Sequence, residues 1–490
     1  MSRKRAIVIG AGIGGLTAAA LLGSRGYDIK VLEKSDRPGG RAAQAAWQGH
    51  TFDLGPTLLF MLDVYRAAFS AWGADFDREV PTIRLRPNYR LNFPNGDILT
   101  VSSVLSETMR SLEEISPGSS RGLLPYLAGA AKSFELSLEH FIGRPVKKAT
   151  QFLAPRVVRA LIDAGAFRSL GKAAARAFAN PGLANAFSFQ SMYLGMSPFQ
   201  SPDLYRLLVF AELGQGIYYP RGGIGALCRA LERAAVANGA SVQYNTDVTS
   251  IDLGADRAWG VRVGQEFYSA DVVVVNADLA YAYAHLLCER RHRSGRMRST
   301  PSALLIYAAL TERYPDLAHH EFLMPQDLKS TCDDIFHLGV VPRDPAVYLA
   351  APSASDPSVA PAGGESLYVL VPVPNLRKFS GWHRTEEIVE RILSTVERRR
   401  LPGLRSRLRF YKTRTPLEFE RNLHLHDGAA FGLSHDVFQI GPLRPDNRHR
   451  RYRNVYFVGA STRPATGLPM VTLGAMQTAE RILEEHPVHA

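Results

Sequence analysis

The segment from Arg5 to Gly15, RAIVIGAGIGG, decides the fold of this 490-residue chain. Residues 5–10 form a short apolar run that predicts a buried parallel strand. A helix is predicted from Gly14 to Arg25, and a second strand from Asp28 to Lys34. This order of strand, glycine loop, helix and strand is that of a βαβ unit. The sequence therefore predicts a Rossmann-type nucleotide-binding unit at its start.

The glycines of this loop have the spacing GxGxxG, and each has its own role. Gly10 permits a tight turn, Gly12 lets a pyrophosphate approach the backbone, and Gly15 allows the helix to pack closely on the strand. The phosphates then meet the positive end of the helix. Glu33 ends the second strand, where its carboxylate is able to accept hydrogen bonds from an adenosine ribose. The loop predicts a bound dinucleotide and leaves NAD and FAD both open.

Two segments that follow the βαβ unit extend the predicted cofactor site. RPGGR (37–41) contains two adjacent glycines, which allow close backbone approach, and a guanidinium suited to a bidentate contact with phosphate. FDLGPT (52–57) predicts a strand that ends in a turn able to press against a planar ring. Both segments favour contacts beyond the adenosine half of the cofactor.

Similar α/β pieces recur later in the chain and alternate with strands of another kind. The recurring pieces are a predicted helix from Gly225 to Asn238, strands at 241–251, 271–278 and 454–460, and a helix from Met470 to Glu484. Between them, the apolar runs at 301–310, 346–352 and 366–373 predict strands of a second sheet. The nucleotide-binding domain is thus expected to be discontinuous, with a second domain inserted into it.

The motifs described above resemble those of a known protein family. GGR and FDLGPT, at their distance from GAGIGG, resemble the amine-oxidase and phytoene-desaturase group of flavoproteins. The segments at 187–205, 219–227 and 415–471 are similar to the bacterial phytoene desaturase family, and the resemblance spans essentially the whole chain. It implies an α/β fold in which a discontinuous Rossmann-type FAD-binding domain carries an inserted mixed-sheet substrate domain and a helical membrane-facing subdomain.

The resemblance also implies domain limits and cofactor contacts. The FAD-binding domain is expected at 1–75, 215–290 and 430–490, the substrate domain at 76–130 and 291–429, and the helical membrane-associating subdomain at 131–214. The residues implied to hold the ADP half and phosphates of FAD are Gly10, Gly12, Gly15, Glu33, Lys34, Gly39, Gly40, Arg41 and, through its backbone at adenine, Val248. Those implied to lie along the ribityl chain or the flavin ring are Gly55, Pro56, Thr57, Gly459, Gly467, Leu468, Pro469 and Met470.

Two positions depart from the pattern of related flavoproteins. Ala460 and Ser461 follow Gly459 where many such proteins place an Asp that binds ribitol. Arg463 stands where members of the family often carry His. The first departure places the carboxylate contact to ribitol in doubt.

The activity that the resemblance implies is FAD-dependent desaturation of a C40 or C30 polyene, by hydride transfer to flavin in carotenoid biosynthesis. The residues leave open another carotenoid oxidoreductase (a 3,4-desaturase, isomerase, saturase or oxygenase) and a non-catalytic flavin-fold membrane scaffold. Quinone and oxygen are both open as terminal electron acceptor. No Ser/His/Asp, HExxH or paired-carboxylate pattern occurs, so the sequence names no catalytic residue.

Other candidate sites have simpler interpretations. His424, His426 and His435, with Asp427 and Asp436, match no metal-binding spacing, and no metal is predicted. His319 and His320 are interpreted as structural. Cys228, Cys288 and Cys332 are far apart and predict no disulfide framework. Six aromatic residues are interpreted as core rather than as a polyene channel: Phe187, Phe189, Tyr193, Phe199, Tyr205 and Phe210.

The charge of the chain favours an anionic surface. The net charge is +12, and no nucleic-acid-binding motif accompanies the basic clusters, so nucleic acid is not an expected partner. Arg144 to Phe178 holds eight basic residues, Lys147 and Lys148 among them, against the single acid Asp163. Arg168, Lys172 and Arg176 share one predicted helical face, while Phe167, Leu170, Ala174 and Phe178 share another. We expect peripheral association with the inner, cytoplasmic face of the cell membrane; the alternative is a charged face packed on the core.

Overall fold

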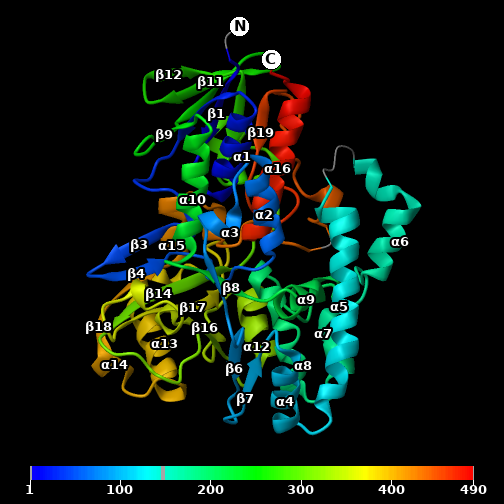
Figure 1. Ribbon diagram of the computed structural model, residues 1–490, viewed down its shortest axis with the longest axis vertical. Helices are drawn as coiled ribbons and strands as arrows, with labels where there is room; N and C mark the ends of the chain where they lie inside the picture. Colours follow the sequence, from blue (N-terminus) through cyan, green and yellow to red (C-terminus); the bar gives the residue numbers. More distant parts are fainter. Residues whose placement is uncertain (1–2, 145–148, 437, 489–490) are drawn as a thin grey trace.

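The computed structural model describes residues 3–144, 149–436 and 438–488. Figure 1 shows a parallel sheet near the chain termini, a larger mixed sheet at the opposite end, and a set of helices along one side. The α/β fold with a Rossmann-like parallel sheet and a mixed second sheet is confirmed. None of the described helices is long and apolar enough to cross a membrane.

The parallel sheet has the strand order β19-β13-β1-β2-β9, and every neighbouring pair is parallel. Its strands come from the beginning, middle and end of the chain, as expected of a discontinuous domain. Helices pack on one face, and the small antiparallel sheet β10-β11-β12 packs toward the other. The strands are β1 (Arg5–Ile9), β2 (Asp28–Leu32), β9 (Ser241–Gln243), β10 (Ser250–Leu253), β11 (Ala258–Val263), β12 (Glu266–Ser269), β13 (Val272–Val275) and β19 (Val455–Phe457); the covering helices are α1 (Ile13–Ser24), α2 (Leu62–Ala71), α3 (Phe76–Glu79), α10 (Ile224–Ala237) and α16 (Leu468–Glu485).

The second sheet is mixed, with the order β18-β14-β17-β16-β15-β6-β7, and is antiparallel except between β15 and β6. In β14 alternate residues face opposite cores: Ile306 packs toward α13, while Tyr307 packs toward the pocket side. Burial on both faces explains why these strands read as continuous apolar runs. The elements are β6 (Tyr89–Asn92), β7 (Ile98–Val101), β14 (Ser302–Leu310), β15 (His320–Leu323), β16 (Val347–Ala350), β17 (Glu365–Val373), β18 (Leu408–Arg414), α12 (Leu328–Asp333), α13 (Thr385–Arg399), α14 (Leu404–Arg407) and α15 (Pro416–Leu423).

Short elements join the two sheets. The hairpin of β3 (Gln44–Trp47) and β4 (His50–Asp53) leads into the 54–57 turn, as the pattern FDLGPT predicts. β5 (Thr82–Arg84) pairs with β8 (Tyr218–Pro220), and α11 (Leu279–Tyr281) follows β13. The prediction of a single strand over 241–251 is wrong, because it is divided between β9 and β10, which belong to different sheets. Val248 therefore lies in the connection between them and not in a strand.

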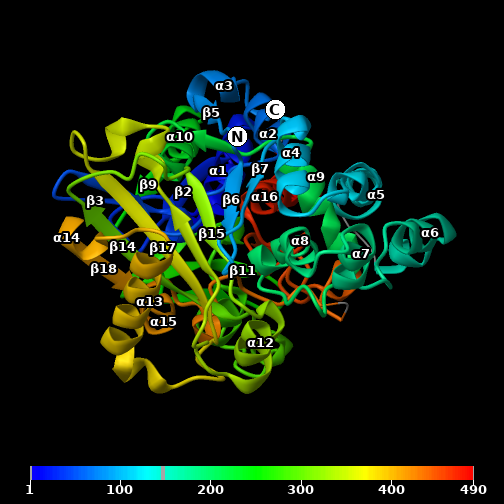
Figure 2. The ribbon, with the colours of Figure 1, turned by 90° about the horizontal axis from the view of Figure 1, so that it is seen from below.

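The helices along one side are α4 (Leu105–Ile115), α5 (Leu123–Ser137), α6 (Pro155–Asp163), α7 (Leu170–Ala177), α8 (Pro181–Ala186) and α9 (Leu207–Leu213). Figure 2, which views the molecule from below, shows α6 at the outer edge of this group and α9 close to the body. Among them, α5 and α9 pack against each other.

The prediction that Arg144 to Phe178 forms one amphipathic surface, with Leu170 and Phe178 on its membrane-facing side, is wrong. The described part contains two separate helices, α6 and α7, and Lys147 and Lys148 lie outside the described residues. Leu170, Ala174 and Phe178 are at most 1% exposed, because the apolar face of α7 packs into the protein core. Phe167 is 77% exposed. The alternative interpretation, a charged face over a packed core, is therefore correct for α7.

Candidate active site

The glycine loop lies at the carboxyl end of β1, where α1 begins. A Cβ on Gly15 would lie 2.1 Å from the Gly10 carbonyl oxygen, so the helix is able to sit this close to the strand only with glycine there. A Cβ on Gly12 would lie 2.6 Å from Asn276 Nδ2, at the end of β13. The loop is thus enclosed between two parallel strands at their carboxyl edge, which is where α/β sheets bind nucleotides.

Glu33 closes the adenosine side of the loop. It is 5% exposed, and its carboxylate accepts hydrogen bonds from the backbone N–H groups of Ala11 at 2.7 Å and Ser35 at 2.9 Å. Lys34 beside it is partly buried, and burial lowers the pKa of its ammonium group. Val248 is buried. Two residues before it, Thr246 donates its N–H to the Glu33 carbonyl oxygen at 2.8 Å, which holds this connection beside Glu33.

The GGR segment lies directly against the glycine loop. Gly39 N–H donates to the Ala11 carbonyl oxygen at 2.9 Å, and Gly39 has a φ of +111°, a conformation that favours glycine. Arg41 donates to the Ala430 carbonyl oxygen at 3.3 Å and faces Asp278 at 3.7 Å. Burial lowers the pKa of the Arg41 guanidinium, and Asp278 opposes that change. A guanidinium is therefore present beside the loop at the place predicted for phosphate.

The later predicted residues reach the same edge from the other end of the chain. Gly459 follows β19, and a Cβ there would lie 3.4 Å from Asn276 Oδ1. Gly467 precedes α16 with a φ of +103° and has no atom within 4 Å of the site of a Cβ. The structure thus brings most predicted cofactor residues around one continuous region. The residues of this group that line the main pocket are Gly55, Pro56, Thr57, Gly467, Leu468, Pro469 and Met470.

The main pocket has a volume of about 660 Å³ and extends from this region under the helices. Phe134 of α5 and Leu161 of α6 form one wall, while Phe322 of β15 and Leu370 of β17 form the opposite wall. Apolar side chains dominate its lining, as in most sites for apolar ligands. The pocket therefore connects the predicted flavin region with the helical side of the molecule.

The aromatic segment 187–210 contributes to both core and pocket. Phe189, Tyr193 and Tyr205 line the pocket, which the core interpretation of this segment did not foresee. Phe187 is fully buried in the core and stacks on Phe178 with ring centroids 4.5 Å apart. The high frequency of aromatic residues in this segment could not show which of them line the pocket and which are buried in the core, because the pocket wall is itself part of the core.

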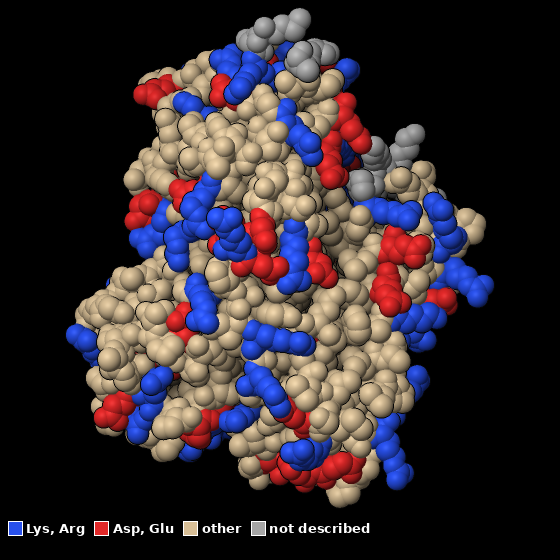
Figure 3. Space-filling model, in the orientation of Figure 1, with Lys and Arg blue, Asp and Glu red and all other residues tan. Residues whose placement is uncertain are grey.

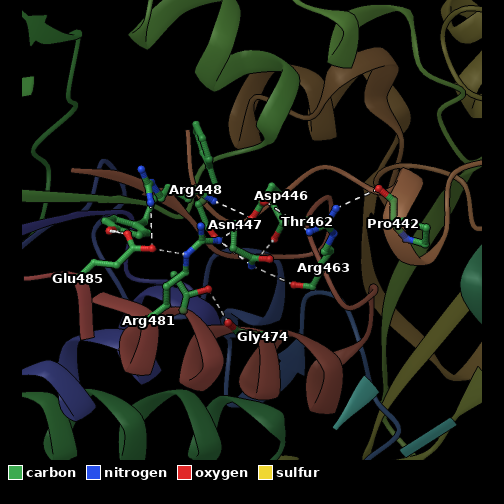
Figure 4. A network of polar contacts seen from close by, with 12 residues as sticks. Pro442, Asp446, Asn447, Arg448, Thr462, Arg463, Gly474, Arg481 and Glu485 are labelled. Atoms are coloured by element: carbon green, nitrogen blue, oxygen red, sulfur yellow. Dashed lines mark hydrogen bonds and ion pairs between the residues drawn. The ribbon is translucent and has the colours of Figure 1, made fainter. Parts of the chain in front are cut away.

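One end of the pocket is polar. Arg481 of α16 bonds to Asp446 at 2.9 Å and to Glu485 at 2.9 Å. Arg463 pairs with Asp446 at 3.4 Å and donates to the Pro442 carbonyl oxygen at 3.0 Å, as Figure 4 shows. Arg463, the position where related proteins often carry His, therefore has a structural ion-pair partner.

Sequence reasoning missed several side chains at the site. Asn276, which touches the glycine loop, and Asp278, which faces Arg41, both follow β13. Thr57 and Tyr348 form a hydrogen bond of 2.6 Å at the pocket wall, but they are distant in sequence. The sequence signal for Asn276 and Asp278 was their position just after the apolar strand VVVV. The carboxyl ends of parallel strands meet at one edge of the sheet, so polar residues there lie beside the glycine loop.

One of the histidines weighed as a metal ligand has a structural partner. His435 is buried, and its Nε2 accepts a hydrogen bond from Thr466 N–H at 3.1 Å. Within residues 3–144, 149–436 and 438–488, no group of three or more His, Cys, Asp or Glu side chains is able to hold a metal ion.

Comparison with known proteins identifies the family. Residues 13–483 match the model of the family "Flavin containing amine oxidoreductase". The chain belongs to this family. It is 39% identical over 486 residues to the zeta-carotene-forming phytoene desaturase of Myxococcus xanthus, covering 98% of this chain and 94% of that protein. It is 32% identical to a 4,4'-diapophytoene desaturase (4,4'-diaponeurosporene-forming) of Staphylococcus haemolyticus, covering 98% of each chain.

The solved structure of an oxidoreductase from Methanosarcina mazei has the same fold. Its TM-score is 0.64 at 16% identity, and the match covers 97% of this chain and 100% of that one. This chain is an FAD-dependent oxidoreductase of the phytoene desaturase type.

FAD fits the cradle that these residues form. The glycines leave the loop open where a Cβ would intrude, Arg41 supplies a cation, and the polar Glu33 carboxylate closes the adenosine side. We propose that the residues predicted from sequence hold FAD here. Bound in this position, FAD would supply a hydride acceptor at the pocket.

Proposed function

We propose that this flavoenzyme desaturates a C40 or C30 polyene of the phytoene or diapophytoene type in carotenoid biosynthesis, with hydride transfer to the flavin. The observation that carries the proposal is the apolar pocket of about 660 Å³ that begins at Thr57 and Gly467 and passes under α5 and α6. An isoprenoid hydrocarbon has no polar group to bind, so its binding must come from burial of apolar surface. The relatives from Myxococcus and Staphylococcus support both chain lengths.

Incubation with purified polyenes tests the proposal. We expect 15-cis-phytoene or 4,4'-diapophytoene to bleach the bound flavin anaerobically, and the product spectrum to shift to longer wavelength as conjugation grows. Products with a moved double bond but unchanged conjugation would favour an isomerase, and hydroxylated products an oxygenase. A flavin that no tested polyene bleaches would favour the scaffold alternative. Quinone and oxygen, added separately after reduction, distinguish the terminal electron acceptors.

We also propose that the protein associates peripherally with the inner face of the cell membrane. The support now comes from α6 and its continuation: Val158, Ile162 and Phe167 are 39%, 55% and 77% exposed. Val158 and Phe167 also line the pocket, so this exposed apolar surface adjoins the substrate site. Arg156 and Arg159 are exposed on the same helix. Such a surface suits partial insertion beside anionic headgroups.

The remaining charge is dispersed. Figure 3 shows basic and acidic side chains interspersed over the visible face, without one continuous basic field. The net charge of +12 therefore acts as a general attraction to an anionic surface, and the apolar residues of α6 supply the local contact.

A further inference from the structure

Desaturation must dispose of a proton. Among the described residues, the carboxylates that line the main pocket are Asp446, Glu480 and Glu484, and none of them adjoins Thr57 in the chain or in the hydrogen bonds of the structure. One hydrogen leaves its carbon with the bonding electron pair, for which FAD is the oxidant. The second leaves the neighbouring carbon as a proton, and the electron pair of that C–H bond becomes the second bond of the new C=C. This inference rests on the proposed desaturation, and it concerns where the proton goes.

A second, smaller cavity lies behind Thr57. Its volume is about 20 Å³, enough for one water molecule, which needs polar partners to be stable there. Thr57 and Tyr368 line both this cavity and the main pocket. The polar side chains around the smaller cavity are Gln44, Thr51, Asp53, Thr57, Tyr219, His319, Ser366 and Tyr368. The Thr57 hydroxyl thus lies between the main pocket and the small polar cavity.

The Thr57 hydroxyl is held by a short chain of side chains. Its Oγ1 lies 2.6 Å from the Tyr348 hydroxyl, which lies 2.8 Å from His320 Nδ1. Burial lowers the pKa of His320 well below its usual value, so the ring stays neutral. His320 Nε2 has no hydrogen-bond partner in the part of the chain that the structure describes. This branch therefore orients Thr57 and stores no proton.

Asp53 differs from the other ionisable groups of the small cavity. Its carboxylate accepts from the N–H groups of Ile224 at 2.8 Å and Gly225 at 3.1 Å, at the start of α10, and from Gln44 Nε2 at 2.9 Å. Burial raises the pKa of Asp53 to about 6, so at pH 7 the ionised form exceeds the protonated form about tenfold. His319 is a poor acceptor, because burial lowers its pKa to about 3.

We propose that Asp53 receives the proton lost by the polyene, delivered from Thr57 through one water molecule in the small cavity. The substrate proton passes to Thr57 Oγ as the Thr57 hydroxyl proton moves to the water, and a water proton moves to Asp53. Each O–H bond that breaks is replaced by one that forms, so Thr57 and the water are regenerated. Asp53 returns the proton to solvent between turnovers, which completes the path.

Asp356, which acts electrostatically on Tyr219 and His319 beside the small cavity, stays ionised near pH 6, because hydrogen bonds from Ser358 and Gly222 outweigh its burial and lower its pKa. Arg229 of α10 is the cation that acts on Asp53, and it favours the ionised carboxylate. Burial raises the pKa of the neighbouring thiol and phenols, which keeps them protonated. These groups are Cys228 on α10, Tyr219 on β8, and Tyr307, Tyr348 and Tyr368 on the mixed sheet. Burial also raises the pKa of Glu365 to about 6, but this carboxyl accepts from the N–H groups of Ser353 and Ser366 at 3.0 Å and does not line the small cavity. Asp53 is therefore the group of the small cavity that is expected to titrate near pH 6.

The pH profile of Asp53→Asn tests the proposal. In the holoenzyme, turnover of phytoene or diapophytoene should fall as the pH drops through about 6, because protonated Asp53 is unable to accept a proton. Asp53→Asn should keep the flavin spectrum, lose roughly tenfold or more of turnover at pH 7, and lose this acid limb. Asp75→Asn, which alters the exposed cap of α3, is the matched control for a capping role and should keep both turnover and limb.

A second readout does not depend on turnover. Infrared titration of the apoprotein should show carboxylic-acid absorption from Asp53 and Glu365 that appears with a midpoint near pH 6, and Asp53→Asn should lose the Asp53 band and keep that of Glu365. Thr57→Val should slow turnover as strongly as Asp53→Asn while leaving the Asp53 band in place, and Thr57→Ser should restore turnover.

The outcomes separate this inference from the proposed function. A wild-type enzyme that desaturates normally, together with an Asp53→Asn variant that keeps full turnover and the acid limb, would overturn the proton path alone. A wild-type enzyme that converts none of the tested polyenes overturns the proposed function, and the proton path with it.

Discussion

The two walls of the main pocket are built in different ways. On the predicted flavin side, hydrogen bonds hold the backbone: Tyr307 donates to the Leu54 carbonyl oxygen at 2.9 Å, and Tyr368 donates to that of Gly55 at 2.8 Å. On the helical side, apolar side chains such as Phe134 and Leu161 form the wall. The first wall fixes atoms for chemistry, whereas the second offers apolar surface from the protein exterior to the site.

The two walls should therefore respond separately to mutation. Changes around the glycine loop should alter the flavin and leave membrane binding intact. Changes on α6 and α7 should do the reverse. A variant on either wall that altered both flavin and membrane binding would show that the two walls are coupled.

The largest effect is expected from Gly12→Val, which should abolish FAD binding. The added side chain would occupy the space that the pyrophosphate needs, and its Cβ would lie 2.6 Å from Asn276 Nδ2. Titration of the apoprotein with FAD measures this effect. Gly295→Val is the matched control, because a Cβ at Gly295 meets no atom within 4 Å. Normal FAD affinity in Gly12→Val would show that the loop is not the cofactor site.

On the helical wall, replacing Val158, Ile162 and Phe167 together with Ser should weaken binding to lipid vesicles. Each loses partly exposed apolar surface worth on the order of 1 kcal/mol when buried, so the triple change predicts about a hundredfold weaker binding. Vesicle co-sedimentation measures it, and the flavin spectrum should not change.

A matched control triple changes the exposed residues Val236, Trp259 and Phe267 to Ser. These residues do not line the pocket. Equal losses in both triples would show that general apolar exposure, and not α6, determines vesicle binding.

Glu33→Ala should weaken FAD binding less than Gly12→Val does. A lost charge-assisted hydrogen bond to ribose costs about 1.5 to 3 kcal/mol, which corresponds to roughly a 10- to 150-fold rise in Kd. The same FAD titration measures it. Asp36→Ala serves as control, since Asp36 is exposed and its side chain bonds to Arg37. An unchanged Kd in Glu33→Ala would show that the Glu33 carboxylate does not contact the adenosine ribose.

The smallest effect is expected from changing Arg168, Lys172 and Arg176 on and beside α7 to Gln. Arg168 already faces Asp203 at 3.4 Å, and the apolar side of α7 is buried in the core. Each of the other two basic groups contributes about 1 kcal/mol near an anionic surface, so we expect a loss of roughly thirtyfold or less. The loss should occur only on anionic vesicles and disappear at high salt. A greater loss than for the α6 triple would reverse the roles of the two helices.

The flavin side could be predicted largely from sequence. Gly12, Glu33 and Gly39 act through backbone geometry and short-range contacts, and the strands and helix around them are local patterns. The family resemblance extended this prediction to Gly467 at the start of α16, which the structure brings to the same edge.

The helical side could not be predicted to the same extent. A periodic pattern of charged and apolar residues gives the orientation of a helix relative to some apolar surface, but it does not say whether that surface is lipid or core. For Leu170 and Phe178 the surface is core, and for Ile162 it is solvent or lipid.

By itself, the sequence determined the nucleotide-binding loop and the two-sheet α/β class, because these depend on local backbone requirements and strand periodicity. The FAD-dependent family followed from the resemblance of its motifs to those of known flavoproteins. Only the tertiary structure decided which aromatic residues line the pocket, that Asp53 and Thr57 border one small cavity, and that Arg463 pairs with Asp446. These arrangements join residues from distant parts of the chain, and their energies depend on burial and distance, which exist only once the sheets have packed together.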